Sequence, residues 1–349
     1  ARDAGTVHGD PAGILDGLDL DVVHVSLPVH VETDVPTVFN PHDLRHVAHP
    51  HFFESRTLDR RRRVYPSACR DAAAIDTFSR ATKAAVVEEY GVDPGDVFPM
   101  ALGPMLGAGE DATGPRGSDS PAGGDAAEDR RGADRTGEDV PADFLLYPAN
   151  TWPHKNHRRL VDALAHVADS HGVDLPLVCT GGRDDRGVAA DHRIDDLEAL
   201  DASDRVLDLG FVAADRLRAL YRACRLVVYP SLYEGGGLPV LEAWQFDAPV
   251  VCADIPPLRE KGGDAALYVD PTDPAAIGET IFEAWSDERV RRRLVERGRE
   301  RRSAFTWERT ARAYRALYRQ TAGESLTPAE ERALEYPADS GHQGGCRRS

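Results

Sequence analysis

The stretch Tyr229-Pro-Ser-Leu-Tyr-Glu-Gly-Gly-Gly-Leu-Pro-Val-Leu-Glu-Ala243 decides the fold, because it leads from a buried strand through three glycines into a helix. The apolar residues 226–229 predict a parallel strand, and Leu238-Pro239 predicts the start of a helix with proline in its first turn. Because glycine has no Cβ atom, a ligand can approach such a turn closely. Three residues make the turn: Gly235, Gly236 and Gly237.

This junction suits a ligand that carries both phosphate and hydroxyl groups. The unpaired N–H groups and the positive dipole end of the helix favour phosphate oxygens. Two carboxylates, Glu234 and Glu242, flank the turn. They repel phosphate, but ionised carboxylates accept hydrogen bonds from the hydroxyls of a hexose or a ribose. The ligand implied is a nucleotide-sugar.

Further stretches on both sides complete a recognisable series. They are Tyr147-Pro-Ala-Asn-Thr-Trp-Pro-His-Lys-Asn-His157, Val206-Leu-Asp-Leu-Gly-Phe-Val212, Leu217-Arg-Ala-Leu-Tyr-Arg-Ala-Cys224, Ala248-Pro-Val-Val251, Ala265-Ala-Leu-Tyr-Val-Asp-Pro271 and Phe305-Thr-Trp-Glu308. Together with the two glutamates, which have seven residues between them, this series resembles retaining glycosyltransferase family 4 (glycosyl transferases group 1) over roughly residues 143–322.

The resemblance implies an α/β architecture of the B type of glycosyltransferases (GT-B), in which two Rossmann-like, doubly wound domains face a cleft. Strand and helix patterns alternate from residue 144, as a parallel doubly wound sheet requires. The expected division is a partial N-terminal, acceptor-side domain at 1–103, a disordered acidic and glycine-rich linker or insertion at 104–141, a C-terminal nucleotide-sugar-binding domain at 142–322 and a disordered tail at 323–349.

The first domain is expected to be truncated. Residues 21–27 and 36–39 predict short buried strands, and residues 69–79 and 81–90 show helical patterns, the second of which ends at Gly91. Members of the family usually place a strand, a glycine-rich loop and further units before the stretch that resembles residues 21–27. Either a misplaced start or a real truncation would explain the difference.

Composition indicates a globular protein without a membrane span. The length of 349 residues suits two domains, 41% of the residues are hydrophobic, and there is no apolar run of about 18 residues. The first residues lack the apolar stretch of a signal peptide, and the five cysteines form no Cys-x-x-Cys pattern, so we expect reduced thiols. A cytoplasmic protein is expected, with peripheral contact at the inner membrane face as an option.

The charge balance excludes one class of partner. Acidic residues number 59 and basic residues 42, which gives a net charge of −17, and only three residues are lysine. Such a surface argues against nucleic acid, because phosphate backbones are bound by basic patches. Abundant aspartate with scarce lysine resembles proteins of salt-loving organisms; an acidic, arginine-rich bacterial protein is the alternative.

The resemblance also assigns residues to the donor. Lys155 would pair with the diphosphate, and Gly210, Phe211 and Val212 would hold the nucleobase through backbone groups, although Phe211 could instead be a core residue. Many relatives carry an arginine six residues before this lysine, where the chain has Ala149. The nearby cations His154 and Arg158 are weaker candidates for the second phosphate contact, and Gly181 would make room for the donor or simply turn the chain.

On the acceptor side, the resemblance places His42 against the transferred sugar as a second catalytic residue beside Glu234. His46, His49 and His51 follow closely, but their spacing fits no structural zinc pattern and no cysteine joins them, so no metal site is expected. Ser79 and Lys83 match positions near the domain interface; a helix N-cap and a solvated lysine explain them equally well.

The predicted mechanism needs no cofactor and no metal. No Asp-x-Asp motif stands beside the glycine turn, so Lys155, the N–H groups of the turn and the helix dipole would stabilise the departing diphosphate. In the family's retaining reaction the acceptor attacks from the same face. Glu234 would orient the hexose and Glu242 would hold the ribose, both ionised. The expected donor is of the GDP-mannose or UDP-glucose type, and the acceptor a glycan or a lipid-linked glycan. The alternatives are a non-catalytic nucleotide-sugar-binding fragment and a sugar-nucleotide epimerase.

Overall fold

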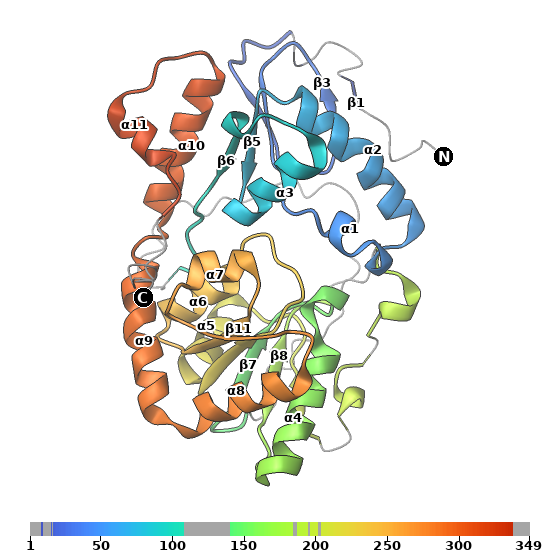
Figure 1. Ribbon diagram of the computed structural model, residues 1–349, viewed down its shortest axis with the longest axis vertical. Helices are drawn as coiled ribbons and strands as arrows, with labels where there is room; N and C mark the ends of the chain where they lie inside the picture. The colour runs from blue at the N-terminus through green and yellow to red at the C-terminus, as the bar shows by residue number, and fades with distance from the viewer. Residues whose placement is uncertain are drawn as a thin grey trace, which may run out of the picture.

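The computed structural model describes residues 8–9, 15, 17–107, 140–183, 187–194, 196–201 and 204–337. Two α/β units lie one above the other (Figure 1), with the N-terminal unit at the top and the C-terminal unit below it. This arrangement, a parallel sheet in each unit, is the one that the sequence predicts.

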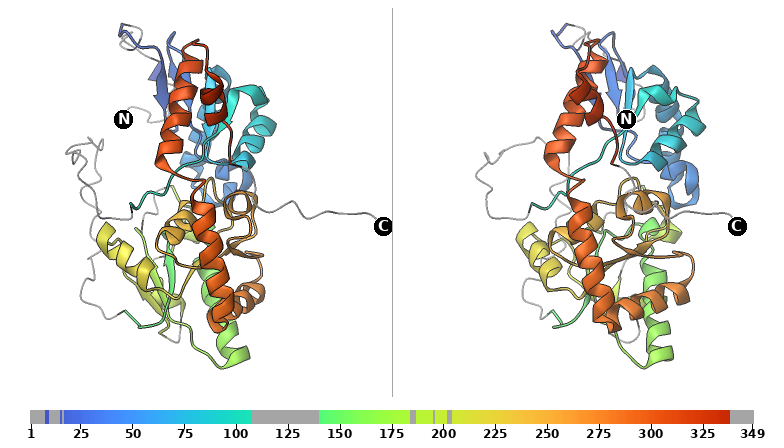
Figure 2. Two further views of the ribbon diagram at one scale, coloured as in Figure 1. Left: turned by 90° about the vertical axis from the view of Figure 1, so that its left-hand side faces the viewer. Right: turned by 60° about the vertical axis from the view of Figure 1, so that its left-hand side comes forward.

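The C-terminal unit is built on a six-stranded parallel sheet in the order β12-β11-β10-β7-β8-β9. Its strands are β7 (Leu145–Pro148), β8 (Leu177–Thr180), β9 (Val206–Asp208), β10 (Leu226–Tyr229), β11 (Val250–Ala253) and β12 (Leu267–Val269). Its helices are α4 (His157–His171), α5 (Ala214–Ala223), α6 (Leu238–Gln245), α7 (Pro256–Gly262), α8 (Pro274–Ser286) and α9 (Glu288–Arg302). Helices cover both faces of the sheet (Figure 2), so the central strands are apolar along their whole length.

The N-terminal unit has a four-stranded parallel sheet in the order β2-β4-β5-β6. Its strands are β2 (Val23–Val25), β4 (Thr37–Phe39), β5 (Ala74–Thr77) and β6 (Val97–Pro99), and its helices are α1 (Arg45–Ala48), α2 (Ser55–Asp71) and α3 (Arg80–Tyr90). A separate two-stranded pair joins β1 (His8–Gly9) to β3 (Val31–Glu32). The strands predicted at 21–27 and 36–39 are confirmed as β2 and β4. The helical pattern predicted for residues 69–79 is wrong over residues 74–77. These residues form strand β5, which pairs with β4 and β6 in the middle of the sheet.

The last helices return to the N-terminal unit. α10 (Trp307–Thr321) and α11 (Pro328–Ala333) lie beside β5 and β6, whereas α9 runs along the lower unit (Figure 1). Ala313 and Leu317 of α10 pack with Val38 and Met100 in one apolar cluster. The boundary predicted at residue 322 is therefore wrong, because the C-terminal unit ends before α10.

A buried polar network fastens α10 to the sheet. The carboxylate of Asp76 accepts hydrogen bonds from the amide of Asn40 at 2.6 Å and from the hydroxyl of Tyr314 at 2.6 Å, and His24 lies 3.1 Å from it. A disordered tail from residue 323 is also wrong for 323–337. α11 begins with a capping box at Thr327, and the carbonyl groups of residues 336 and 337 accept hydrogen bonds from Arg80.

Part of the predicted linker and of the predicted tail, residues 108–139 and 338–349, lies outside the described residues. Within the described ranges, no helix combines the length and the apolar character that crossing a bilayer requires.

Candidate functional site

The candidate site lies where the order of the strands reverses. β8 and β9 continue the sheet on one side of β7, and β11 and β12 continue it on the other side of β10. In doubly wound sheets, ligands bind outside the carboxyl ends of the strands at this reversal. β7 leads into the short helix η3 (Pro153–Lys155), and β10 leads into the glycine turn. The two stretches predicted to bind the donor thus meet at one edge of the sheet.

Lys155 is held at this edge by its neighbour Asn156. Asn156 adopts a left-handed backbone conformation with φ of 66°. Its side-chain amide donates hydrogen bonds to the carbonyl oxygens of Pro230 at 2.9 Å and Pro271 at 2.7 Å. The hydroxyl of Tyr147 donates to the carbonyl of Lys155. These contacts fix the backbone from which the lysine side chain extends.

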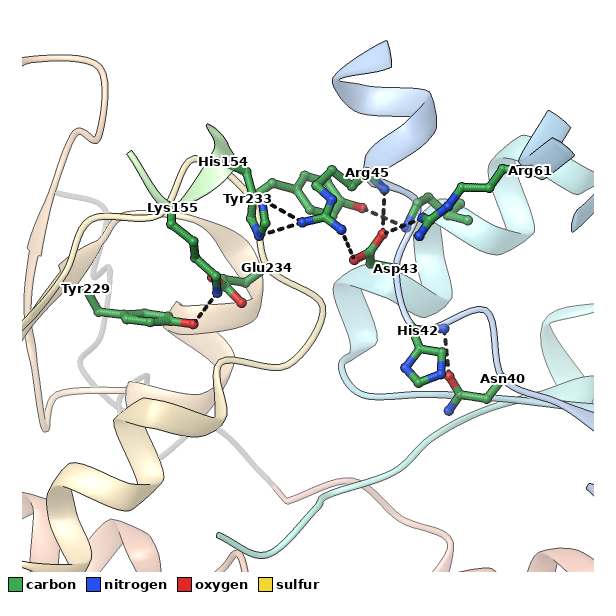
Figure 3. Close-up of polar contacts among 11 residues, drawn as sticks. Asn40, His42, Asp43, Arg45, Arg61, His154, Lys155, Tyr229, Tyr233 and Glu234 are labelled. Atoms are coloured by element: carbon green, nitrogen blue, oxygen red, sulfur yellow. Dashed lines mark hydrogen bonds and ion pairs between the residues drawn. The ribbon is translucent and has the colours of Figure 1, made fainter. Parts of the chain in front are cut away.

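The ammonium group of Lys155 donates hydrogen bonds to Oε1 of Glu234 at 2.6 Å and to the hydroxyl of Tyr229 at 2.7 Å (Figure 3). The side chains of Lys155 and Glu234 are 13% and 9% exposed. Attraction between charges is stronger in such a partly desolvated place than in water. Burial raises the pKa of Tyr229 well above its usual value, so its hydroxyl stays protonated. The two residues predicted for opposite ends of the donor therefore form one ion pair.

The glycine turn packs against the N-terminal unit. A Cβ atom at Gly235 would lie 2.5 Å from the carbonyl oxygen of His42, and one at Gly236 would lie 2.9 Å from Cβ of Phe78. The carbonyl of Gly235 accepts a hydrogen bond from the hydroxyl of Thr82 at 3.3 Å. From the sequence, these glycines are expected to let a ligand approach. The structure adds another reason, since glycine is needed for the two units to come together.

Helix α6 begins directly after the turn. Gly237 precedes it with φ of 59°, and a Cβ atom there would lie 2.3 Å from Cδ2 of Leu258. Leu238 is the first residue of the helix and Pro239 lies in its first turn, so the predicted helix start is confirmed. The N–H groups of the first turn consequently point toward the edge of the sheet that carries Lys155.

Glu242 lies on α6, and its carboxylate is buried. The hydroxyl of Tyr221 donates a hydrogen bond to Oε2 of Glu242 at 3.0 Å. Burial raises the pKa of Glu242, and hydrogen bonds from Tyr221 and from the backbone of Leu106 oppose that rise. Ionisation is thus less favourable here than the prediction of an ordinary ionised carboxylate assumed. Leu106 also brings the end of the N-terminal unit close to this carboxylate.

His42 faces the glycine turn from the N-terminal unit (Figure 3). Its backbone has φ of 58°, and its N–H donates to the side-chain oxygen of Asn40 at 2.6 Å. Nε2 lies 2.6 Å from the carbonyl oxygen of Ser26. Since a carbonyl only accepts, Nε2 is the donor in this hydrogen bond. The structure places His42 at the boundary of the units.

The predicted nucleobase edge lies at the ends of β8 and β9. Gly181 has φ of 141°, and a Cβ atom there would lie 2.5 Å from the backbone of Ala149, so the close approach of β7 requires glycine. The N–H of Gly181 donates to the carbonyl of Gly210 at 2.8 Å. Phe211 is 71% exposed, so it is not a core residue, whereas Val212 is buried.

Ser79 and Lys83 belong to helix α3. The hydroxyl of Ser79 accepts a hydrogen bond from the N–H of Thr82 at 3.1 Å, so Ser79 is the N-cap. Glu260 of α7 accepts hydrogen bonds from the next two N–H groups of this helix at 2.7 Å each, which links α3 to the other unit. Burial lowers the pKa of Lys83, and Asp93 opposes that shift.

Neither candidate for the second phosphate cation is suitably placed. Arg158 is exposed and donates to the carbonyl of Arg193 at 3.3 Å. His154 is buried, and burial together with Arg45 lowers its pKa well below the usual value, so its ring is neutral.

Arg45, which no sequence pattern singled out, comes from α1 and crosses to the other unit. Its Nη1 atom lies 2.6 Å from the ring nitrogens of His154, and its guanidinium stacks 4.5 Å from the centre of the Trp152 ring. No periodic pattern in the sequence distinguishes Arg45. The one available signal for a role at the site was its position three residues after His42. Arg45 therefore places a cation against His154, the residue that directly precedes Lys155.

The histidines after His42 do not gather around a metal. His46 packs on Tyr65 with ring centres 4.5 Å apart, and His49 stacks on Phe52. In the part of the chain that the structure describes, no three His, Cys, Asp or Glu residues are arranged to hold a metal ion.

Comparisons with known proteins show which proteins parts of this chain resemble. Residues 131–301 match the family model "Glycosyl transferases group 1". The O-antigen chain mannosyltransferase B of Escherichia coli is 35% identical over 178 residues, which are 50% of this chain and 46% of that protein. The D-inositol 3-phosphate glycosyltransferase of Geodermatophilus obscurus is 30% identical over 256 residues, which are 71% of this chain and 52% of that protein. The chain thus spans about half the length of these curated relatives.

Solved structures share the fold. The sucrose-phosphate synthase of Thermosynechococcus elongatus aligns with a TM-score of 0.63 and 21% identity, covering 87% of this chain and 74% of that one. HepE of Anabaena, solved in complex with UDP and glucose, aligns with a TM-score of 0.61 and 19% identity over 87% and 77% of the chains. The chain therefore has the GT-B fold, and its residues 131–301 match a glycosyl transferases group 1 domain.

Proposed function

We propose that this chain forms the donor site of a retaining hexosyltransferase, which moves a hexose from a nucleoside diphosphate sugar to a hydroxyl of a glycan or lipid-linked acceptor. The observation that carries the proposal is the ion pair of Lys155 and Glu234. It lies at the carboxyl ends of β7 and β10, beside the glycine turn and opposite His42.

The ion pair gives each end of the donor a partner. A diphosphate carries more negative charge than one carboxylate, so it would replace Glu234 as the partner of Lys155. Glu234 would then accept hydrogen bonds from the hexose hydroxyls. The ammonium group, the N–H groups at the start of α6 and the helix dipole would stabilise the charge on the departing diphosphate. These contacts supply leaving-group stabilisation without a metal ion, and we expect no cofactor.

The acceptor would enter from the N-terminal unit. His42 is exposed at the boundary, which suits a contact with the transferred sugar. In a same-face reaction, the departing phosphate takes the proton of the attacking hydroxyl as the new glycosidic bond forms and the bond to the phosphate oxygen breaks. The configuration of the sugar is thereby retained.

The remaining groups would hold the nucleoside. Glu242 would accept hydrogen bonds from the ribose hydroxyls, and the exposed ring of Phe211 lies beside the backbone groups at the end of β9, where a base could stack. Relatives named as mannosyltransferases support a GDP-mannose type of donor. The structural neighbour in complex with UDP and glucose supports a UDP-glucose type. The proposal therefore includes both types of donor. The proposed site of action is cytoplasmic, at or near the inner membrane face.

One alternative rests on a specific observation. Because the chain spans about half the length of its curated relatives, it could bind a nucleotide-sugar without catalysing transfer. The decisive experiment titrates the full chain with GDP, UDP and their hexose conjugates by calorimetry and then measures release of the nucleoside diphosphate with glycan acceptors. Binding without release supports the non-catalytic alternative, and the absence of any binding contradicts both functions.

A further inference from the structure

A cavity of about 60 Å³ lies between the two units, and His154, the residue before the donor lysine, forms part of its wall. Its lining includes Arg45, Phe53 and Arg61 from the N-terminal unit, and Trp152 and His154 from the other. Its volume exceeds the roughly 10–15 Å³ that one water molecule needs. Residues of both units line it, and one of them, His154, is adjacent in sequence to Lys155.

Two arginines in its wall have unused hydrogen-bonding capacity. The side chains of Arg45 and Arg61 are 5% and 17% exposed. Within the described ranges, the buried Nε atoms of Arg45 and Arg61 have no hydrogen-bond partner. Buried polar groups are nearly always paired, so a pair of orphaned donors beside a cavity indicates a missing acceptor.

The charges around the cavity point to an anion. One carboxylate, that of Asp43, serves both arginines, and its ion pairs are long, 3.8 Å to Arg45 and 3.7 Å to Arg61 (Figure 3). Because the pKa of His154 is lowered well below its usual value, its ring is neutral and does not change the charge balance around the cavity. Two guanidinium groups therefore share one carboxylate at a depth where charge is costly.

Aromatic rings hold both guanidinium groups in place. Arg45 lies 4.5 Å from the centre of the Trp152 ring, and Arg61 lies 5.0 Å from the centre of the Phe53 ring. Stacking on a ring fixes the plane of a guanidinium and leaves its N–H edge free for hydrogen bonds. This arrangement suits the two-point contact with phosphate or carboxylate oxygens for which arginine is adapted.

We propose that Arg45 and Arg61 form a subsite for an anionic group on the acceptor, either a phosphate or the carboxylate of an acidic sugar. That the anion belongs to an acceptor rests on the proposed transferase function. The anion site itself is inferred from the cavity and its arginines. Binding of the anion would fix the acceptor beside the donor and hold the two units together.

Titration of the full chain with three probes tests the subsite: methyl phosphate, methyl glucuronide as the carboxylate source and the neutral methyl glucoside. Arg61→Gln is the main variant, because its side chain is the more exposed of the two. It should weaken binding of the preferred anion by about tenfold or more, Arg61→Lys should weaken it less, and Asp43→Asn should strengthen it. Methyl glucoside should not compete.

Lys155→Ala distinguishes this subsite from the donor site. Binding of the anionic probe should survive in Lys155→Ala, whereas binding of nucleoside diphosphate should fall. Equal affinity of Arg61→Gln and the unchanged chain, or loss of the probe in Lys155→Ala, overturns the proposal, as does the absence of binding by either anion. If Arg61-dependent binding persists in a chain that binds no nucleotide-sugar, the transferase function fails and the anion site stands.

Discussion

The Nζ atom of Lys155 lies 2.6 Å from Oε1 of Glu234, so the residue assigned to the diphosphate and the residue assigned to the hexose hold each other. Binding of a donor must separate this pair. The exchange of one partner for another lets the site keep its lysine neutralised both before and after the donor binds.

Lys155→Ala should weaken binding of a nucleoside diphosphate by about ten- to a hundredfold, because a charge-assisted contact worth roughly 1.5–3 kcal/mol is lost. Calorimetry with GDP and UDP measures the effect. Arg158→Ala is the matched control, since it removes a positive charge three residues away on the exposed side of α4. Equal losses in both variants would mean that only general electrostatics is involved.

Glu234→Gln and Glu242→Gln should have opposite effects on the bare nucleotide. Glu234→Gln frees Lys155 from its anionic partner, so affinity for the nucleoside diphosphate should rise a few-fold, while turnover drops because the hexose contact is weakened. Glu242→Gln weakens the acceptor for the ribose, so affinity should fall. Parallel titrations and rate measurements decide; a fall in nucleotide affinity in both variants would contradict the exchange of partners.

Gly236→Ala should slow transfer by a larger factor than it weakens binding of the nucleotide. The new methyl group would lie 2.9 Å from Cβ of Phe78, so the units must move apart. A displacement of about 1 Å at a reacting centre can cost on the order of a hundredfold in rate. Gly182→Ala is the control, because a Cβ atom there meets nothing within 4 Å. A normal rate in Gly236→Ala would show that this contact is not needed for transfer.

Transfer should persist in the presence of EDTA, because protein groups alone are proposed to stabilise the departing diphosphate. The assay compares rates with EDTA and after addition of manganese. Activity that EDTA abolishes and manganese restores would reject this part of the mechanism.

Acid should destabilise the fold through His46. Burial lowers its pKa from 6.5 to about 4, so the folded state binds fewer protons than the unfolded state between these values. The stability that depends on a neutral His46 is present above pH 6.5 and is lost as the pH falls toward 4. The free energy of unfolding should drop by about 2 kcal/mol between pH 7 and pH 5 from this residue. Urea denaturation of His46→Gln should show a pH dependence smaller by that amount, and an unchanged dependence would contradict the assignment.

Local patterns in the sequence were sufficient for the sheet of the C-terminal unit and for the start of α6. Those elements have apolar runs next to glycine and proline signals, and their alternation with helices indicates that the strands are parallel. β5 was missed because Ala74–Thr77 is short and contains the polar residue Asp76, which the fold buries against the hydroxyl of Tyr314. A pairing between residues 238 positions apart leaves no local signal.

The same reason explains what was missed at the site. The series around Lys155 and Glu234 identified the donor edge, but the contact between Gly235 and His42 and the crossing of Arg45 depend on how the two units meet. Each of these contacts joins residues more than 100 positions apart, so sequence patterns within one element cannot show them.

Helix α10 also affects the order in which the protein can fold during synthesis. The N-terminal sheet leaves the ribosome first, but the apolar face formed by Val38, Ala74 and Met100 is covered by Ala313 and Leu317, which are made some 200 residues later. Until then this face stays open to solvent, while the C-terminal unit, made in one continuous stretch, can already close. The unit that is synthesised first is therefore the one that is completed last.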